Sequence, residues 1–325
     1  MTYTTLGDTG VDVSRLCLGC MNFGSERPWM MNDRDASIDL IHEALDHGIN
    51  FLDTANVYST GESEDIVGDA VASANRDELV LATKVFGEMR DGPNGSGLSR
   101  KHILDQVEAS LDRLDTDYID LYQIHRWDDD TPIEETLAAL DRLVETGRVR
   151  YIGASTMTAY EFTKALYTSD IEDYSRFACM QPEYSAVARY EEANLLEVCN
   201  REGVGVIPWS PLAGGFLTGK YEREAEPTEG TRGAASESVR GYFTEENWAV
   251  LDAVRDVAAE IDATPAQVAL AWLLERDVVT APIIGPRSSD HLRENVDAVS
   301  VDLSDEEAAR IEAPKTPRWP APGSD

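Results

Sequence analysis

Four polar side chains stand at or just past the ends of strand-like runs, where they could deliver a proton to a carbonyl oxygen. Asp53, Lys84 and His125 each end an apolar run, and Tyr58 follows Asp53 by five residues. If these runs form parallel strands, their carboxyl ends lie side by side. We therefore expect the four side chains to meet in one pocket, built around a phenol.

Each of the four residue types has a part in such chemistry. The phenol of Tyr58 is a poor acid at neutral pH, because its ordinary pKa is about 10. The ammonium group of Lys84 stabilises the phenolate and lowers that pKa, while Asp53 keeps the buried ammonium charged. The imidazole of His125 can hydrogen-bond the substrate oxygen or share the proton. Together they predict a proton donor for a carbonyl that is being reduced.

Taken alone, each residue also has a structural interpretation. A strand-end aspartate can cap the next helix, a strand-end histidine can satisfy a backbone carbonyl, and Tyr58 can be a surface aromatic. Lys84 is harder to explain in this way, because a barrel interior rarely admits a lysine. The four residues in combination favour a catalytic set.

The elements that must position these residues alternate between strand-like and helical patterns. A turn at 7–10 predicts a small N-terminal hairpin. Eight strand-like runs follow, at 14–19, 49–54, 79–85, 118–125, 149–154, 177–181, 205–209 and 282–284. Helical patterns come after them, at 33–47, 63–74, 99–114, 132–146, 159–167, 191–201, 244–261 and 290–298. The fold class this predicts is α/β, a (β/α)8 TIM barrel that makes residues 1–325 a single domain.

Two helix starts carry recognisable capping signals. Ser99 is a good N-cap candidate for the third helix. For the fourth helix we expect Thr131 to be the cap, with Pro132 at the first helical position and Glu134 at the third.

The alternation is interrupted once, between the seventh and eighth strands. Residues 213–241 are rich in glycine and charge, and extra helical patterns cover 244–261 and 264–275. A loop this long inside a compact domain is usually functional. We therefore expect residues 213–243 to form a lid over a ligand. The proline-rich tail 314–325 should run irregularly over the surface.

Net charge is the unusual property of the composition. The chain has 61 acidic and 28 basic residues, a net charge of −33 and a pI near 4.3. Such charge destabilises a compact state at low ionic strength, and concentrated salt screens it. We therefore expect a cytoplasm with molar salt, as in a halophilic archaeon, although an acidic mesophilic protein remains the alternative. Nucleic-acid partners are disfavoured, because phosphates would meet a repulsive surface.

Compartment and redox chemistry leave fewer signals. The N-terminus shows no signal-peptide pattern, and no run approaches the roughly 20 apolar residues of a membrane helix. We expect a soluble cytoplasmic protein without a membrane partner. Cys17 and Cys20 spell a redox motif, but a strand would hold them about 10 Å apart on opposite faces. We therefore expect neither a disulfide nor a metal role there.

Three motifs closely resemble the aldo-keto reductase family. They are Asn50–Tyr58 together with 61–64 (Gly-Glu-Ser-Glu), 82–84 (Ala-Thr-Lys) and 120–125 (Asp-Leu-Tyr-Gln-Ile-His). The resemblance extends from Leu6 to about Asn295. It implies a (β/α)8 barrel that reduces aldehydes and ketones with a nicotinamide cofactor, usually NADPH, without a Rossmann fold or a metal. The length and the long loop look most like the bacterial-type branch related to potassium-channel β-subunits.

The same resemblance assigns roles to individual residues. The catalytic set maps onto Asp53, Tyr58, Lys84 and His125, with the tyrosine as proton donor. Ser155 and Gln181 would contact the carboxamide of the nicotinamide. Thr156 stands where asparagine is usual, which weakens that contact without excluding it. The aromatic that stacks on the ring maps onto Tyr184, for which a packed interior position is the alternative.

Further positions would hold the rest of the cofactor. A flap would follow the seventh strand and include Trp209, Ser210, Pro211, Leu212, Gly214, Gly219 and Lys220. The last barrel helix, whose N-terminus suits phosphate, would contribute Gly285, Arg287, His291, Glu294 and Asn295. Residues after the first strand would line the reactive end, namely Gly19, Cys20 and Met21.

Arg287 decides the expected cofactor, because its guanidinium can pair bidentately with a 2′-phosphate. It favours NADPH over NADH. Glu294 and Asn295 could bind adenine, and His291 stands where glutamine is common. Trp29, Trp127 and Trp209 are candidate walls of an apolar substrate pocket, although any of them can instead be core.

The functional expectation is a carbonyl reductase that acts on a small molecule, with hydride from the nicotinamide and the proton from Tyr58. The alternative is a regulatory subunit that senses redox state by holding NADP(H) and turns over slowly. A phosphate-binding barrel isomerase would leave the four polar residues unexplained. The sequence leaves the physiological carbonyl and the oligomeric state open.

Overall fold

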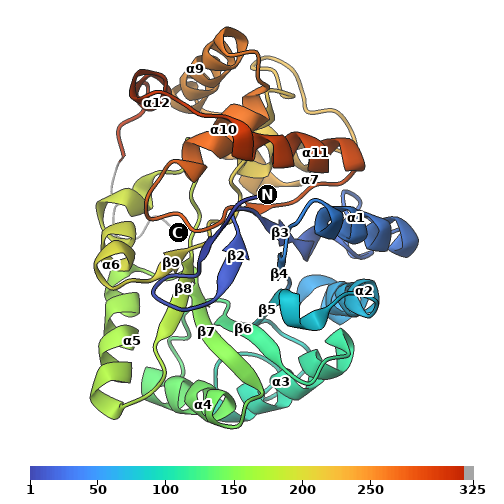
Figure 1. Cartoon of the computed structure of the whole chain (residues 1–325), viewed down its shortest axis with the longest axis vertical. Helices are drawn as coiled ribbons and strands as arrows, with labels where there is room; N and C mark the ends of the chain where they lie inside the picture. The colour runs from blue at the N-terminus through green and yellow to red at the C-terminus, as the bar shows by residue number, and fades with distance from the viewer. Residues whose placement is uncertain (318–325) are drawn as a thin grey trace.

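The protein is a closed barrel of eight parallel strands, surrounded by helices (Figure 1). We use a computed structural model, which describes residues 1–317. The strands are β3 (Cys17–Gly19), β4 (Phe51–Asp53), β5 (Val80–Val85), β6 (Ile119–Ile124), β7 (Val149–Ser155), β8 (Phe177–Gln181), β9 (Gly205–Val206) and β10 (Ile283–Ile284). Their order is β10-β3-β4-β5-β6-β7-β8-β9. The predicted (β/α)8 fold is confirmed.

The barrel closes between its first and last neighbours through backbone hydrogen bonds. The amide of Thr280 donates to the carbonyl of Val206 at 2.8 Å, and that of Ile283 donates to the carbonyl of Pro208 at 2.9 Å. Because β9 and β10 are only two residues long, each bond joins a residue of one strand, Val206 of β9 or Ile283 of β10, to a residue just outside the other. Closure leaves no unpaired sheet edge at this seam.

Helices cover the outside of the barrel. Those that follow the strands are α1 (Arg34–Asp46), α2 (Glu62–Val71), α3 (Arg100–Leu114), α4 (Ile133–Glu145), α5 (Ala159–Glu172), α6 (Leu195–Arg201) and α11 (Ser289–Asp297). The long insertion contains α7 (Arg232–Ala235), α8 (Glu237–Arg240), α9 (Glu245–Glu260) and α10 (Pro265–Leu274). Short 3-10 turns are η1 (Cys20–Asn22), η2 (Tyr58–Gly61), η3 (Arg76–Glu78), η4 (Tyr190–Ala193), η5 (Ala213–Thr218) and η6 (Ala298–Ser300). The insertion is therefore partly helical rather than one structureless loop.

Capping chemistry sets most helix starts. The side chain of Ser99 accepts a hydrogen bond from the amide of His102, as predicted for an N-cap. The prediction for α4 is wrong by one residue: Pro132 is the N-cap, and the Thr131 hydroxyl donates to Asp128 instead.

One further helix, α12 (Asp305–Glu312), was not expected from the sequence. Its capping box, in which Ser304 and Glu307 cap each other, was the available signal. Residues 314–317 have no regular structure, and the remainder of the predicted tail lies outside the described residues.

The N-terminal hairpin closes one end of the barrel. Strands β1 (Tyr3–Thr5) and β2 (Asp12–Ser14) pair antiparallel, as expected, and cross the front of the barrel in Figure 1. Leu6 and Val13 pack with Phe51, Val80 and other apolar side chains inside the barrel. This interior cluster is separate from the larger core between strands and helices. The hairpin thereby leaves the opposite end, where the strands finish, for a site.

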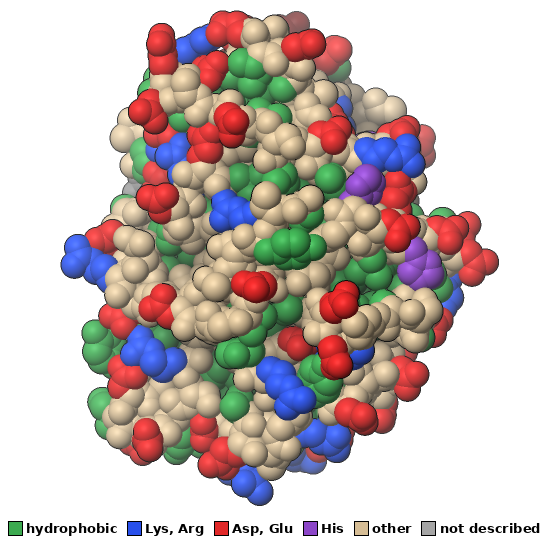
Figure 2. All heavy atoms as spheres, viewed as in Figure 1, with side chains coloured by type: hydrophobic (Ala, Val, Ile, Leu, Met, Phe, Trp, Pro, Cys, Tyr) green, Lys and Arg blue, Asp and Glu red, His purple; other side chains and the backbone are tan. Residues whose placement is uncertain are grey.

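The four cysteines are free and buried, so Cys17 and Cys20 form no disulfide. Within residues 1–317, no helix is both long and apolar enough to cross a membrane. The view in Figure 2 shows the face around the hairpin, where acidic and basic side chains are interspersed.

Candidate active site

The structure brings the four predicted residues together at the carboxyl end of the barrel. Lys84 Nζ donates to Asp53 Oδ2 at 2.5 Å, to the Thr54 carbonyl at 2.9 Å and to Tyr58 Oη at 3.0 Å. These bonds account for all three protons of the ammonium group. The ring centroids of Tyr58 and His125 lie 5.7 Å apart at 81°. Strand register explains the meeting, since Asp53 pairs with Ala82, two residues before Lys84.

Burial makes the phenol a weaker acid than the sequence suggested. Burial raises the pKa of Tyr58 above its ordinary value, although the Lys84 ammonium acts in the opposite direction. The expected net lowering is therefore wrong for the protein alone. Burial would also lower the pKa of Lys84, but Asp53 and Tyr58 raise it above the ordinary value. Tyr58 is thus protonated, and Lys84 is charged, at neutral pH.

His125 is neutral at physiological pH. Burial lowers the pKa of its imidazole to about 3, and the positive charges of Lys84 and Arg126 add to the effect. A neutral imidazole can still donate one hydrogen bond through one ring nitrogen. Of the two roles considered for His125, the geometry and charge favour orienting a substrate oxygen over sharing a proton.

An ion pair between buried Glu64 and partly exposed Arg113 holds the loop that carries Tyr58 in place. Glu64 is fully buried and accepts from Thr83 Oγ1 at 2.5 Å and from Arg113 Nε at 2.6 Å. Gly61 has a positive φ of 99°, and a Cβ there would come 2.7 Å from Arg113 Cδ. This explains physically why glycine and glutamate occur at these positions of the 61–64 motif. The pair holds the start of α2, and with it the preceding turn, against α3.

Two buried amides hold the Asp53 carboxylate. Gln123 Nε2 and Gln181 Nε2 donate to Asp53 Oδ1 at 2.8 and 3.0 Å. Gln181 was predicted as a site residue, whereas Gln123 was missed. The available signal was the two-residue period of a strand, which puts Gln123 on the same face as His125.

The residues expected to contact the carboxamide of the nicotinamide lie together, and Thr156 among them has an unusual backbone conformation. Ser155 Oγ donates to the carbonyl of Gln181 at 2.9 Å and lies 3.2 Å from Thr156 Oγ1. Thr156 adopts a left-handed φ of 47°, a conformation that asparagine tolerates better than a β-branched residue.

Tyr184 is not placed to stack on a cofactor. The residue is 2% exposed, and its ring packs against that of Trp272 of α10, with centroids 5.4 Å apart. Its hydroxyl donates to Glu192 at 2.7 Å. The structure therefore supports the alternative of a packed interior aromatic. Trp209, which follows β9 and is half-buried, keeps part of its surface accessible.

Three basic side chains converge beside the insertion. The pKa of Lys220 is lowered by partial burial and by the charges of Arg287 and Arg232. Arg287 Nη1 donates to the carbonyls of Trp29 at 3.0 Å and Gly230 at 3.3 Å. The guanidinium of Arg232 lies 4.7 Å from the centroid of the Trp29 ring. In a chain of net charge −33, such a cluster of cations favours an anionic ligand.

Arg232 is the second site residue that sequence reasoning missed. Its Nε atom is buried and has no hydrogen-bond partner within residues 1–317. Burial lowers its pKa, and the phenols of Tyr242, Tyr221 and Tyr58 oppose that shift, so the group lies within electrostatic reach of Tyr58. An unsatisfied buried donor of this kind fits the phosphate groups of a dinucleotide.

The insertion turns sharply where it leaves the barrel. Gly214, Gly215 and Gly219 all have positive φ values, of 64°, 91° and 77°. A Cβ on Gly215 would collide with Lys220 Nζ, so glycine there leaves room for the lysine.

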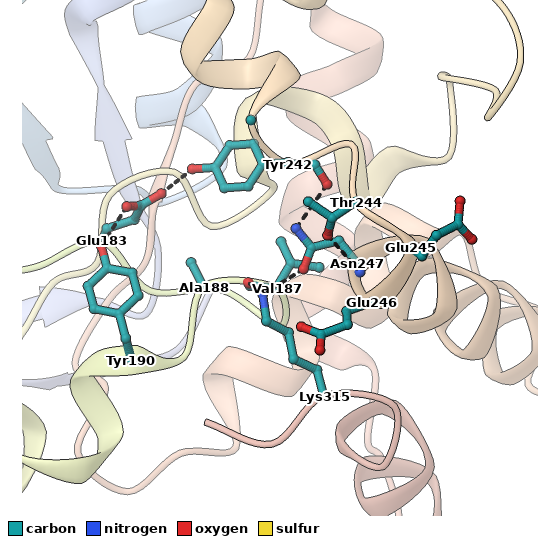
Figure 3. A pocket seen from close by; sticks show the side chains of 11 residues that line it. Glu183, Val187, Ala188, Tyr190, Tyr242, Thr244, Glu245, Glu246, Asn247 and Lys315 are labelled. Carbon is teal, nitrogen blue, oxygen red and sulfur yellow. Dashed lines mark hydrogen bonds between the residues drawn. The ribbon is translucent and has the colours of Figure 1, made fainter. Parts of the chain in front are cut away.

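The far end of the insertion is tied to the loop after β8. Tyr242 donates to the carboxylate of Glu183, which also accepts from Tyr190 at 2.6 Å (Figure 3). These residues line a pocket of about 420 Å³ that also includes Asn247 and Lys315. The pocket contains none of the catalytic residues. We regard the Glu183 contacts as a clasp between the insertion and the barrel.

The remaining predicted positions lie around the barrel end. Gly19 ends β3, Cys20 and Met21 follow in η1, and the backbone of Gly19 pairs with Asp53. Ser210, Pro211 and Leu212 follow β9 and lead into η5. Asn22 Nδ2 donates to the Gly285 carbonyl at 2.8 Å, which ties the ends of β3 and β10 together.

At the start of α11, Ser288 caps the amide of His291, whose side chain is exposed. Glu294 is half-buried, and Asn295 is buried on the same helix. Of the predicted substrate walls, Trp29 is 7% exposed beneath Arg232, and Trp127 is half-buried with Lys164 5.9 Å from its ring centroid.

Comparison with known proteins agrees with this geometry. Residues 15–315 match the aldo/keto reductase family, and the chain belongs to that family. It is 39% identical to a versiconal hemiacetal acetate reductase of Aspergillus parasiticus, over 99% of each chain. It is 40% identical to an uncharacterized oxidoreductase of Bacillus subtilis, over 94% of this chain and 93% of that one. A probable voltage-gated potassium channel subunit beta of Arabidopsis thaliana is 36% identical, over 93% and 92%.

The protein is accordingly an oxidoreductase that acts on carbonyl or alcohol groups, and its family generally uses NAD(P)H. The relatives named above come from a fungus, a bacterium and a plant, and they lend no support to an archaeal origin.

Proposed function

We propose that this protein reduces an aldehyde or ketone to the alcohol with NADPH, in a reversible reaction in which Tyr58 supplies the proton. The observation that carries the proposal is the continuous chain of hydrogen bonds from Asp53 through Lys84 to Tyr58. It ends on a half-buried phenol at the open end of the barrel. The fold itself does not require a fully buried lysine at this position. A phenol that acts as a proton donor does require one, because the ammonium group stabilises its phenolate.

Each residue of the catalytic set has a separate role in the proposed reduction. A bound nicotinamide supplies the hydride that adds to the carbonyl carbon. Tyr58 donates its proton to the carbonyl oxygen as negative charge develops there, and its phenolate is stabilised by Lys84. Asp53 keeps the ammonium charged, and neutral His125 donates a hydrogen bond that orients the same oxygen. Solvent then returns a proton to Tyr58, so that one carbonyl, one hydride and one proton give one alcohol.

The cofactor preference rests on charge. Lys220, Arg232 and Arg287 place three cations beside the insertion, and Arg232 has an unsatisfied buried donor. A dinucleotide with a 2′-phosphate brings more negative charge to such a cluster than one without it. We therefore propose NADPH over NADH, with residues 213–243 as the cover over the bound cofactor.

The test is steady-state oxidation of NADPH with a panel of aldehydes and ketones, comparing the wild type with Tyr58→Phe. The variant keeps the ring and loses the proton, so kcat should fall by roughly 100-fold or more while NADPH binding persists. Equal turnover in the two proteins would refute the assignment of Tyr58 as the acid.

A second candidate function is an NADP(H)-binding regulatory subunit with slow turnover. The channel-subunit relative in Arabidopsis is the observation that favours it. In that case the wild type should bind NADPH tightly and oxidise it slowly with every carbonyl of the panel. Rapid turnover with any of them would favour the reductase.

A further inference from the structure

Gln123 is a fully buried amide that lies inside the barrel end, in direct contact with the catalytic set. Its side chain is 0% exposed, beside Asp53 at 2% and Gln181 at 3%. On β6 it lies between Leu121, which belongs to the apolar barrel interior, and His125. An apolar residue would be buried there at a lower cost in free energy, because burying an amide is unfavourable unless its hydrogen bonds are made.

Gln123 makes hydrogen bonds in both directions. Its Nε2 donates to Asp53 Oδ1 at 2.8 Å, and its Oε1 accepts from Gln181 Nε2 at 3.1 Å. Gln181 Nε2 also reaches Asp53 Oδ1, at 3.0 Å. Because a carboxylate only accepts, both amide nitrogens must face Asp53, and this sets the orientation of the two side chains. The result is a closed triangle that joins the ends of β4, β6 and β8.

The neighbouring strand makes room for this side chain. A Cβ on Gly153 of β7 would come 3.0 Å from Gln123 Cγ and 2.7 Å from Cys179 Sγ. Glycine at position 153 thus leaves room for the Gln123 side chain beside β7. The space left by Gly153 and the hydrogen bonds to Asp53 and Gln181 together indicate that this position is specific for an amide side chain.

The triangle controls the direction in which the Asp53 carboxylate acts. Oδ1 is occupied by the two amides, which leaves Oδ2 aimed at Lys84. The remaining donors of Lys84 are taken up by the Thr54 carbonyl and by Tyr58, so the ammonium has one orientation.

We propose that Gln123 is a positioning residue that couples the carboxamide end of the cofactor site, at Gln181, to the proton donor, at Tyr58. This inference rests on the proposed reductase function. Gln123 does not touch the reacting atoms; it acts through Asp53 and Gln181. Without it, the Gln181 amide loses one acceptor and Asp53 Oδ1 is held by Gln181 alone, so the carboxylate turns away from Lys84 more easily.

The first test is Gln123→Leu, which has a similar size and lacks both polar groups. We expect kcat to fall by roughly 10- to 100-fold, as for a small misplacement of reacting groups. The dissociation constant of NADPH, measured by its fluorescence, should change less than threefold, because the proposed phosphate-binding cations Lys220, Arg232 and Arg287 are unchanged. Gly153→Ala should lower kcat in the same sense by pushing on the Gln123 side chain.

The second test is Gln123→Glu, which introduces a pH-dependent substitute for the amide. Asp53, Lys84 and Cys179 are the titratable groups nearest this position, and Cys17, Cys20, Tyr58 and His125 interact electrostatically with Asp53 or Lys84. Burial and the Asp53 charge raise the pKa of the introduced carboxyl, which when protonated can donate to Asp53 and accept from Gln181. The ratio of kcat in this variant to that of the wild type should be highest near pH 6 and fall towards pH 9. The same ratio for Gln123→Leu should stay flat.

Thr136→Val is the matched control, because it removes a buried hydrogen bond to the Leu98 carbonyl outside the barrel. It should leave kcat and the pH profile unchanged even where it lowers the melting temperature. The proposal is overturned if Gln123→Leu keeps kcat within threefold of the wild type, or if the Gln123→Glu ratio does not depend on pH. If the wild type itself does not turn over, the proposed function fails. The coupling is then tested separately. Because Gln123 contacts Gln181 at the carboxamide end, the fluorescence intensity of bound NADPH should change with pH in Gln123→Glu but not in the wild type. The same pH dependence in both proteins would overturn the coupling.

Discussion

Arg287 is the residue whose charge should choose between the two nicotinamide cofactors. Replacing it with alanine removes the proposed partner of a 2′-phosphate. We expect the KM for NADPH to rise roughly 10- to 100-fold, because a charge-assisted hydrogen bond is worth about 1.5–3 kcal/mol, and the KM for NADH to change far less. Steady-state kinetics with both cofactors measure this difference.

Arg287 also donates to the carbonyls of Trp29 and Gly230, so its loss can disturb the insertion as well. Arg293→Ala is a suitable control, since that arginine lies on α11 and pairs with Glu43. Equal effects of Arg287→Ala on NADPH and NADH would show that the arginine only supports the insertion.

His125 should make stability depend on pH in a defined direction. Its pKa is about 3 in the folded protein and about 6.5 when unfolded, so the unfolded state takes up a proton first as pH falls. The stability associated with neutral His125 is complete above pH 6.5 and is lost progressively as pH falls towards 3. Relative to His125→Asn, the free energy of unfolding should fall by up to about 1.4 kcal/mol per pH unit.

Urea denaturation of both proteins between pH 5 and 7.5 measures this effect. The variant also removes the imidazole from the other titrations, so only the difference between the proteins is interpreted. A difference that stays constant over this range would mean that the pKa of His125 is the same in the folded and unfolded states.

At the scale of elements, the insertion is the part whose movement should limit access to the cofactor. Its far end is held by the hydrogen bond from Tyr242 to Glu183. Tyr242→Phe removes that bond, which we expect to be worth about 1 kcal/mol, and so to speed NADP release roughly fivefold. Stopped-flow fluorescence of cofactor release measures the rate.

Tyr190→Phe is the matched control, because Tyr190 donates to the same carboxylate but does not belong to the insertion. Release should be nearly unchanged in that variant. If both variants accelerate release equally, Glu183 itself, rather than the clasp across to the insertion, controls the cofactor.

The sequence predicted the secondary-structure elements but not the side-chain contacts between them. The eight strands and the four predicted catalytic residues followed from apolar runs with polar ends, since parallel strands bring their ends together whatever their separation along the chain. Gln123, Arg232 and the Glu183 clasp did not follow. Each depends on side chains that meet across strands or loops, and a polar residue alone does not reveal its partner. Tyr184 was misplaced for the same reason, because its burial depends on α10.

At the scale of the whole molecule, the net charge of −33 should make stability depend on salt. Self-repulsion weakens as the Debye length falls from about 10 Å at 0.1 M to about 3 Å at 1 M. We expect the melting temperature to rise by roughly 5–10 °C between dilute buffer and about 2 M KCl, equivalent to a few kcal/mol. Differential scanning fluorimetry measures the shift.

Sucrose at matched osmolality separates charge screening from general solvent exclusion, because it has no ionic strength. A melting temperature that is the same in dilute buffer and in concentrated KCl would remove the argument for a high-salt cytoplasm.

The sequence by itself determined the barrel, the order of its elements and the convergence of Asp53, Tyr58, Lys84 and His125, because local periodicity and the geometry of parallel strands are enough for that. Only the tertiary structure decided the protonation states and the orientation of these groups. Burial leaves Tyr58 a weaker acid and His125 neutral, and the amides of Gln123 and Gln181 orient Asp53. Such effects depend on desolvation and on contacts between residues far apart in the chain, which no local pattern records.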